Sequence, residues 1–74
     1  MTFEQFQEMI VSFIMRHDPT VSSFVDFDEE DGKYIARAGN YDFNMPANGL
    51  MVTINLNRRN HTFQTPVRAL LEAG

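Results

Sequence analysis

Apolar residues recur at intervals of three and four near the start of the chain. The stripe consists of Phe3, Phe6, Ile10, Phe13 and Ile14. Spacing of this kind puts the side chains on one face of an α-helix. Thr2 is placed to cap that helix, and Asp18-Pro19 is placed to end it, because the residue before a proline avoids helical backbone. The pattern therefore predicts an amphipathic helix between Thr2 and Asp18.

Two further apolar residues of this segment do not fit the stripe. Val11 and Met15 are four positions apart and lie toward another side of the same helix. Either a second layer of the domain covers them, or they form a second apolar strip that faces a partner. One such partner is a second copy of the chain, which would bind through this strip or through an open edge strand to form a homodimer.

From Val21 to about Gln64 the apolar period changes to two, which is typical of strands. The alternation predicts a meander of four or five antiparallel strands. The face expected to be buried carries Val25, Phe27, Tyr34, Ala36, Ala38, Tyr41, Phe43, Met45, Leu50, Val52, Ile54, Leu56 and Phe63. The opposite face carries Asp26, Asp28, Lys33, Ile35, Arg37, Asp42, Asn44, Met51, Thr53, Asn55 and Asn57.

Turn-forming residues set the expected strand pairing. The first turn is expected at residues 29–32, the second at Gly39-Asn40, and the third at residues 46–49. These turns pair Asp28 with Lys33, Arg37 with Asp42, and Phe43 with Val52. Opposite charges then face each other across the strands, which favours this pairing slightly.

The last segment, residues 65–74, predicts a short helix. Thr65 is expected as its N-cap, Pro66 at its first position and Gly74 at its end. The buried stripe of this helix is expected to be Val67, Leu70 and Leu71. The sequence therefore predicts one α+β domain over residues 1–74, with both helices on one face of an antiparallel sheet.

The composition is that of an ordinary globular domain. Hydrophobic residues make up 43% of the 74 residues and charged residues 22%, and cysteine is absent. Without thiols neither disulfides nor thiolate metal sites are expected. The apolar runs are too short to cross a membrane, and the acidic start is unlike a secretory signal. We therefore expect a cytoplasmic protein without a cofactor.

The acids around the first turn have three interpretations. Asp26, Asp28, Glu30 and Asp31 precede Gly32 in a spacing similar to that of a calcium loop. An EF-hand opening at Asp26 needs glycine at its sixth position and glutamate at its twelfth, so the match fails. Two interpretations stay open: an acidic patch that meets a basic partner, and a solvated turn whose charges discourage strands from pairing edge to edge.

The net charge of −4 argues against a dedicated nucleic-acid binder and permits a partner with a basic surface. No spacing of nucleophile, histidine or glycine-rich loop selects a catalytic site, so we do not expect an enzyme. The favoured hypothesis is a small interaction or regulatory protein, such as one encoded by a phage or mobile element, that occludes a protein partner's basic surface. The residues expected to bind that partner are Asp26, Asp28, Glu29, Glu30, Asp31, Ile35, Arg37 and Met51.

The alternative is a nucleic-acid-binding module. Arg58, Arg59 and His61 form the basic cluster of the sequence and are expected at the tip of a hairpin. A basic tip is suited to contact phosphate, and such binding would weaken steeply with salt.

Overall fold

The computed structural model of the chain describes residues 1–72, and their side chains except those of residues 22, 23 and 72. Two α-helices, five strands and two short 3-10 helices follow one another along the chain. They are α1 (Phe3–His17), η1 (Pro19–Phe24), β1 (Asp26–Glu30), β2 (Lys33–Ala38), β3 (Tyr41–Pro46), β4 (Met51–Leu56), η2 (Asn57–Arg59), β5 (His61–Pro66) and α2 (Val67–Glu72).

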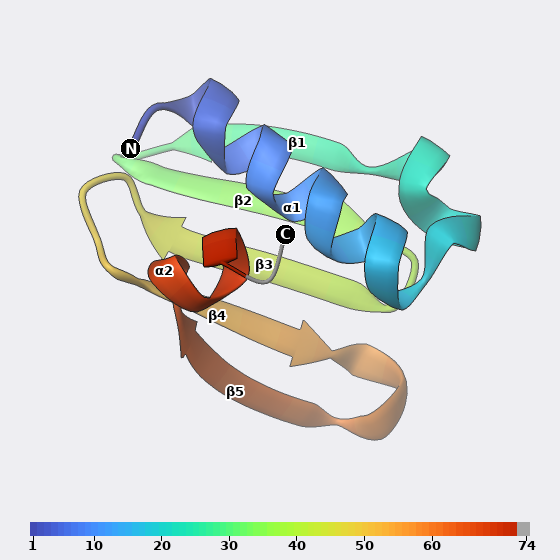
Figure 1. Cartoon of the computed structure of the whole chain (residues 1–74). Coiled ribbons are helices and arrows are strands. Elements are labelled where there is room, and N and C mark those ends of the chain that lie inside the picture. The colour runs from blue at the N-terminus through green and yellow to red at the C-terminus, as the bar shows by residue number, and fades with distance from the viewer. Residues whose placement is uncertain (73–74) are drawn as a thin grey trace.

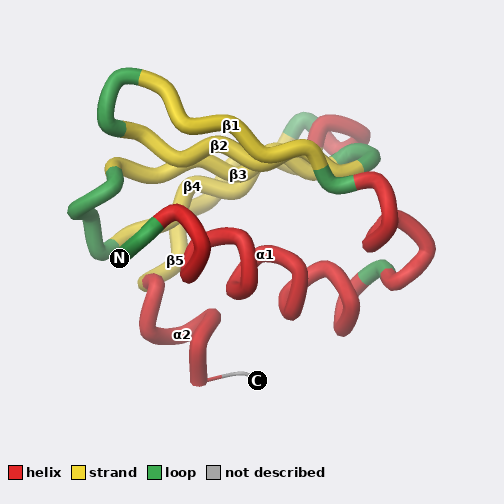
Figure 2. The backbone as a smooth tube through the Cα atoms, turned by 90° about the horizontal axis from the view of Figure 1, so that it is seen from above, coloured by secondary structure: helices red, strands yellow, loops and turns green. Residues whose placement is uncertain are grey.

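The five strands form one antiparallel sheet in the order in which they occur in the sequence, β1-β2-β3-β4-β5. Figure 1 shows α1 crossing the sheet diagonally, and Figure 2 shows both helices on the same side of it. The expected α+β fold, a helix, a meander and a second helix, is confirmed. The helices leave the other face of the sheet uncovered.

The first helix begins at a capping box. The Thr2 hydroxyl accepts a hydrogen bond from the Gln5 backbone N–H (3.1 Å), and the Gln5 side chain accepts one from the Thr2 N–H (2.8 Å). These bonds satisfy two of the backbone donors that a helix start leaves unpaired. At the other end the Asp18 N–H donates to the Ile14 carbonyl (2.7 Å). The expected bounds of the helix are confirmed.

One hydrophobic core lies between the helices and the sheet. From α1 it takes Phe6, Ile10 and Ile14, all fully buried as the stripe predicts, and also Met9. The sheet and α2 contribute Tyr34, Ala36, Ala38, Phe43, Met45, Val52, Ile54, Val67 and Leu70. Among the described residues no polar or charged residue is buried, so this core is held by apolar packing.

The strand registers are partly as expected. The β2–β3 pairing is confirmed, with Arg37 opposite Asp42 across the Gly39-Asn40 turn. The β1–β2 pairing was wrong, because Lys33 lies opposite Glu30 and not opposite Asp28. Asp31 and Gly32 both have positive φ, 50° and 75°, as a two-residue type I′ turn requires. The turn is therefore shorter than the four residues expected.

The β3–β4 pairing is also displaced by two residues. Phe43 lies opposite Ile54 and not opposite Val52, because the four-residue connection spans residues 47–50 and not 46–49, so that Pro46 belongs to β3. The Gly49 N–H donates to the Pro46 carbonyl (2.9 Å) within that connection. Leu50, expected on the buried face, lies in the connection and is 80% exposed.

Both ends of the meander differ from the expectation. The chain from Pro19 to Phe24 forms the 3-10 helix η1, so the strand pattern begins later than Val21. Thr65 and Pro66 belong to β5, and α2 begins at Val67, so Thr65 is not the expected N-cap and Pro66 is not the expected first helical residue. Thr65 pairs with Val52, and this ladder prevails over the local helix signal. The expected end of the helix at Gly74 lies outside the described residues.

Some residues expected to be buried are not. Leu71 is 54% exposed, because the short α2 turns only Val67 and Leu70 onto the core. Phe63 lies on the expected side of the sheet, opposite Ile54, but is 37% exposed. In the second strip of α1, Val11 is half-buried and Met15 is 58% exposed, so no second layer covers Met15.

Candidate functional site

The sheet face that the helices leave open carries most of the expected partner-binding residues. Alternate side chains of each strand point to this face, and the registers align them in rows across the sheet. One row runs Asp26, Arg37, Asp42, Asn55 and Thr62, and the next runs Asp28, Ile35, Asn44, Thr53 and Gln64. We call this surface the open face.

The charges of the open face are concentrated on its first three strands. The edge strand β1 contributes Asp26, Asp28 and Glu30, whereas β2 contributes Lys33 and Arg37 on either side of Ile35. Arg37 has an acid opposite it on each neighbouring strand, and Lys33 has Glu30 opposite it. Cross-strand neighbours of this kind are about 5 Å apart at Cβ, so the two cations are partly balanced. The excess negative charge lies on β1.

Two adjoining hollows lie on the part of the open face nearest the β1 edge. The first, of about 310 Å³, is lined by Asp26, Phe27, Asp28, Glu30, Ile35 and Arg37. The second, of about 380 Å³, is lined by Lys33, Ile35, Arg37, Asp42, Phe43, Asn44 and Asn55. Ile35 and Arg37 belong to both hollows, and Ile35 is half-buried. The structure thus brings together five of the eight expected residues, with Asp26, Asp28, Glu30 and Arg37 around the apolar side chain of Ile35.

The other three expected residues lie elsewhere. Glu29 pairs with Tyr34 and so lies on the helix side of the sheet, exposed beyond the edge of the core. Asp31 is part of the tight turn after β1. Met51 lies on the open face but on β4, opposite Pro66, which places it away from the β1–β2 hollow. Sequence alternation could have separated Glu29 from its neighbours on β1.

Side-chain hydrogen bonds join polar groups on the far part of the open face. Asn57, the first residue of η2, donates from its side chain to the carboxylate of Asp42 (2.8 Å). Gln64 donates to the hydroxyl of Thr53 (3.3 Å). Asn57 was not among the expected functional residues, and nothing in its sequence context indicates that it reaches back to β3.

The basic cluster is divided between two elements. Arg58 and Arg59 lie in η2, exposed, and Asn60 follows with a left-handed backbone, φ 51°. His61 begins β5 opposite Leu56 on the helix side, and its ring lies 5.5 Å from that of Phe63. Arg58 and Arg59 thus lie at the expected hairpin tip between β4 and β5, whereas the His61 ring packs beside Phe63.

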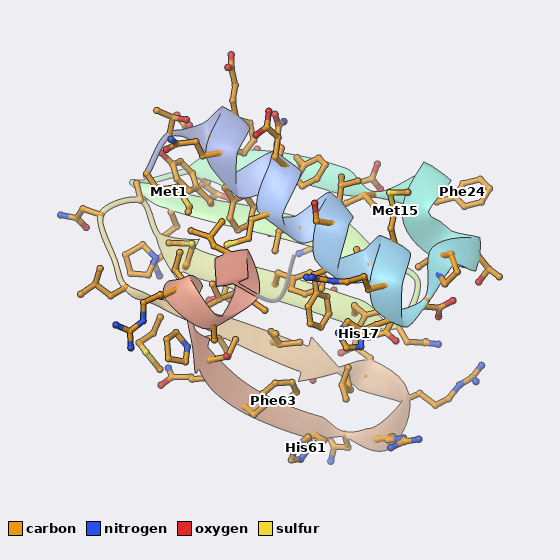
Figure 3. All side chains as sticks on the ribbon, in the orientation of Figure 1. Met1, Met15, His17, Phe24, His61 and Phe63 are labelled. Carbon is orange, nitrogen blue, oxygen red and sulfur yellow. The ribbon has the colours of Figure 1, made fainter. Side chains whose placement is uncertain are left out.

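The helix side has its own apolar surfaces. A groove of about 390 Å³ between α1 and α2 is lined by Met1, Gln5, Glu8, Met9, Ser12, Leu70 and Leu71. Figure 3 shows the exposed side chains of Met15 and Phe24 at one end of the molecule, and those of His61 and Phe63 on the edge strand β5. His17, at the end of α1, stacks on Phe13 with ring centres 4.2 Å apart.

Within residues 1–72 no group of three or more His, Cys, Asp or Glu side chains is arranged to hold a metal ion. In the same part of the chain no helix has the length and apolar character needed to cross a membrane. Comparisons of the chain with protein-family models, curated proteins and solved structures found no match. The function is therefore argued from the surface itself.

Proposed function

We propose that this protein is a small interaction protein without catalytic activity that binds a positively charged segment of a protein partner on the β1–β2 part of its open face. The observation that carries the proposal is the row of carboxylates, Asp26, Asp28 and Glu30, beside a half-buried isoleucine in a shallow hollow. This combination offers an apolar contact surrounded by ionic ones, which is the usual anatomy of a protein interface.

Each part of the hollow has a separate role in this proposal. The carboxylates on the edge strand accept hydrogen bonds from lysine or arginine side chains of the partner. Ile35 packs against an apolar residue between those cations, and the Arg37 stem broadens the apolar floor. Covering a partner's basic segment in this way would block whatever that segment contacts, which is how a small regulator or inhibitor acts.

The overall charge assists the encounter. Five of the six residues from Asp26 to Asp31 are acidic, and the net charge of the chain is −4. A negative field of this kind speeds association with a basic partner and weakens as salt rises, because the Debye length falls from about 30 Å at 0.01 M to about 8 Å at 0.15 M. Association rates should therefore fall as the salt concentration is raised.

The test uses a display library of random peptides selected on the immobilised protein at low salt. Enriched peptides should carry two or more lysines or arginines flanking an apolar residue. Titrated into labelled protein, a selected peptide should shift the backbone amides of β1 and β2. Shifts confined to other elements, or selection of peptides without basic residues, would contradict the proposal.

Charge-matched variants separate the open face from general electrostatics. The variant Asp26→Asn/Asp28→Asn/Glu30→Gln removes three carboxylates from the open face. The control Glu4→Gln/Glu8→Gln/Glu29→Gln removes three exposed carboxylates from the helix side. The first should weaken peptide binding at least about tenfold, since charge-assisted bonds contribute roughly 1.5–3 kcal/mol each. The control should weaken peptide binding only slightly, and an equal loss of affinity in both variants would contradict the proposal.

A further inference from the structure

The two edges of the sheet differ in a way that bears on self-association. On β1 four of the five residues are acidic, Phe27 being the exception. On β5, the sequence HTFQTP contains no acid, lysine or arginine. An edge strand has a row of backbone N–H and C=O groups without strand partners, and charged side chains are the usual means of preventing another strand from pairing there. The β1 edge has this protection, and β5 lacks it.

We propose that β5 pairs with β5 of a second copy of this chain, antiparallel and about a two-fold axis at Phe63, so that the two sheets join into one. Pro66 has no backbone N–H, so the part of β5 able to form a full ladder is His61–Thr65. The centre of this five-residue segment is Phe63. A two-fold axis there pairs His61 with Thr65 and Thr62 with Gln64 of the second copy.

The side chains agree with this axis. Antiparallel pairing about an axis perpendicular to the sheet keeps each side chain on its own face, so Phe63 meets its symmetry mate on the helix side. Phe63 is 37% exposed in the single chain, and Figure 1 shows β5 as the edge strand beyond both helices. The paired rings cover each other, and aromatic pairs of this kind stabilise antiparallel strands. Every directly opposed pair is free of like charge.

The charge distribution favours a second copy at β5 over a second copy at β1. Two β1 edges brought together would place eight carboxylates along one seam, and two β5 edges would place none. In the proposed dimer the β1 strands lie at the two outer edges, as far from the axis as the sheet allows. Both open faces then point the same way and stay accessible, so two binding hollows are presented together.

The interface is small, with one strand from each chain and a single aromatic pair at the axis, so the dimer is expected to be weak. Sedimentation equilibrium of the wild-type protein should give a mass that rises from the 8.5 kDa of the single chain toward twice that value between about 1 μM and about 500 μM. The variant Phe63→Lys places two cations against each other at the axis and should remain at the lower mass. The control Phe24→Lys makes the same change at a phenylalanine in η1, 71% exposed, and should behave as wild type.

A second measurement does not depend on the stability of Phe63→Lys. The chain has no cysteine, so Phe63→Cys carries a single thiol that faces its symmetry mate. Opposed residues of antiparallel strands have Cα atoms about 4.5–5.5 Å apart, within the range that a disulfide spans. Under mild oxidation Phe63→Cys should form a covalent dimer at least about tenfold faster than Phe24→Cys. Equal rates, or a wild-type mass that stays at 8.5 kDa at every concentration, would overturn the proposal. Neither result would bear on peptide binding by the open face.

Discussion

The seven phenylalanines of the chain occupy very different environments, from full burial to 71% exposure. Phe43 is fully buried on the central strand β3, where its ring meets that of Phe13 edge-on with centres 5.6 Å apart. Phe24 lies in η1 with 71% of its surface exposed. The same residue type therefore contributes very differently to stability at these two positions.

We expect Phe43→Ala to lower the free energy of unfolding by about 3–5 kcal/mol, because it removes a packed ring and leaves a cavity. For a domain of this size that is most of the total stability. Phe24→Ala, the matched control, should change it by less than about 0.5 kcal/mol. Urea titration followed by circular dichroism measures both values. Similar losses in the two variants would show that the core is not centred on Phe43.

At the scale of elements, the β2–β3 hairpin packs against η1 through its turn. Gly39 has φ 58°, and a β-carbon built on it would lie 3.0 Å from a Val21 methyl carbon. Gly32, in the β1–β2 turn, has φ 75° with open space around it. Both glycines have a left-handed backbone, but only at Gly39 would a β-carbon also press on a neighbouring side chain, that of Val21.

Gly32→Ala should therefore cost about 1–2 kcal/mol, from backbone strain alone. Gly39→Ala should cost more, because the new methyl group also displaces Val21. A double-mutant cycle with Val21→Ala isolates this contact and should give a coupling free energy of about 0.5 kcal/mol or more in the direction of rescue. Equal costs at the two glycines, with no coupling to Val21, would show that the turn and η1 do not press on each other.

The element scale also explains how far the sequence predicts this fold. The face of most strand residues was predictable, since alternation assigns it: Ile35 lies on the open face and Phe43 in the core. The end of β5 was not, because Thr65 and Pro66 carry the signal of a helix start. Registers were less predictable, because a slip of two residues keeps every side chain on its face. Only turn chemistry distinguishes such slips. An Asp-Gly pair such as Asp31-Gly32 is typical of a two-residue hairpin turn, and the expectation of a four-residue turn did not use this signal.

For the candidate site, the same alternation groups Asp26, Asp28 and Glu30 and excludes Glu29. The depth of the hollow at Ile35 was not predictable, because it depends on the curvature of the sheet and on the neighbouring strand. The exposure of Phe63 was equally hidden in the sequence. It depends on how far the helices extend over the sheet, and Figure 1 shows that the short α2 does not reach across to cover the β5 edge.

For the molecule as a whole, stability should vary from the middle of the sheet to its edges. The inner strands β2, β3 and β4 are paired on both sides, and β2 and β3 hold fully buried residues such as Ala36 and Phe43 beneath α1. The edge strands β1 and β5 each pair on one side only.

Hydrogen exchange of the backbone amides should therefore be slowest in β2 and β3 and at least about tenfold faster in β1 and β5, because edges open without unfolding the core. Nuclear magnetic resonance of protein in deuterated buffer at low micromolar concentration measures these rates, and the dilution keeps chains apart. Exchange in β5 as slow as in β3 under those conditions would contradict this picture.

The order of the elements has a consequence for synthesis on the ribosome. The apolar stripe of α1 leaves the exit tunnel first, yet the strands that bury it, as far as Ile54 on β4, are translated afterwards. Until then Phe6, Ile10 and Ile14 have only part of the sheet that buries them in the folded protein. We expect the nascent helix to remain exposed to water and to chaperones until β4 has been synthesised, after which the core closes in a single late step.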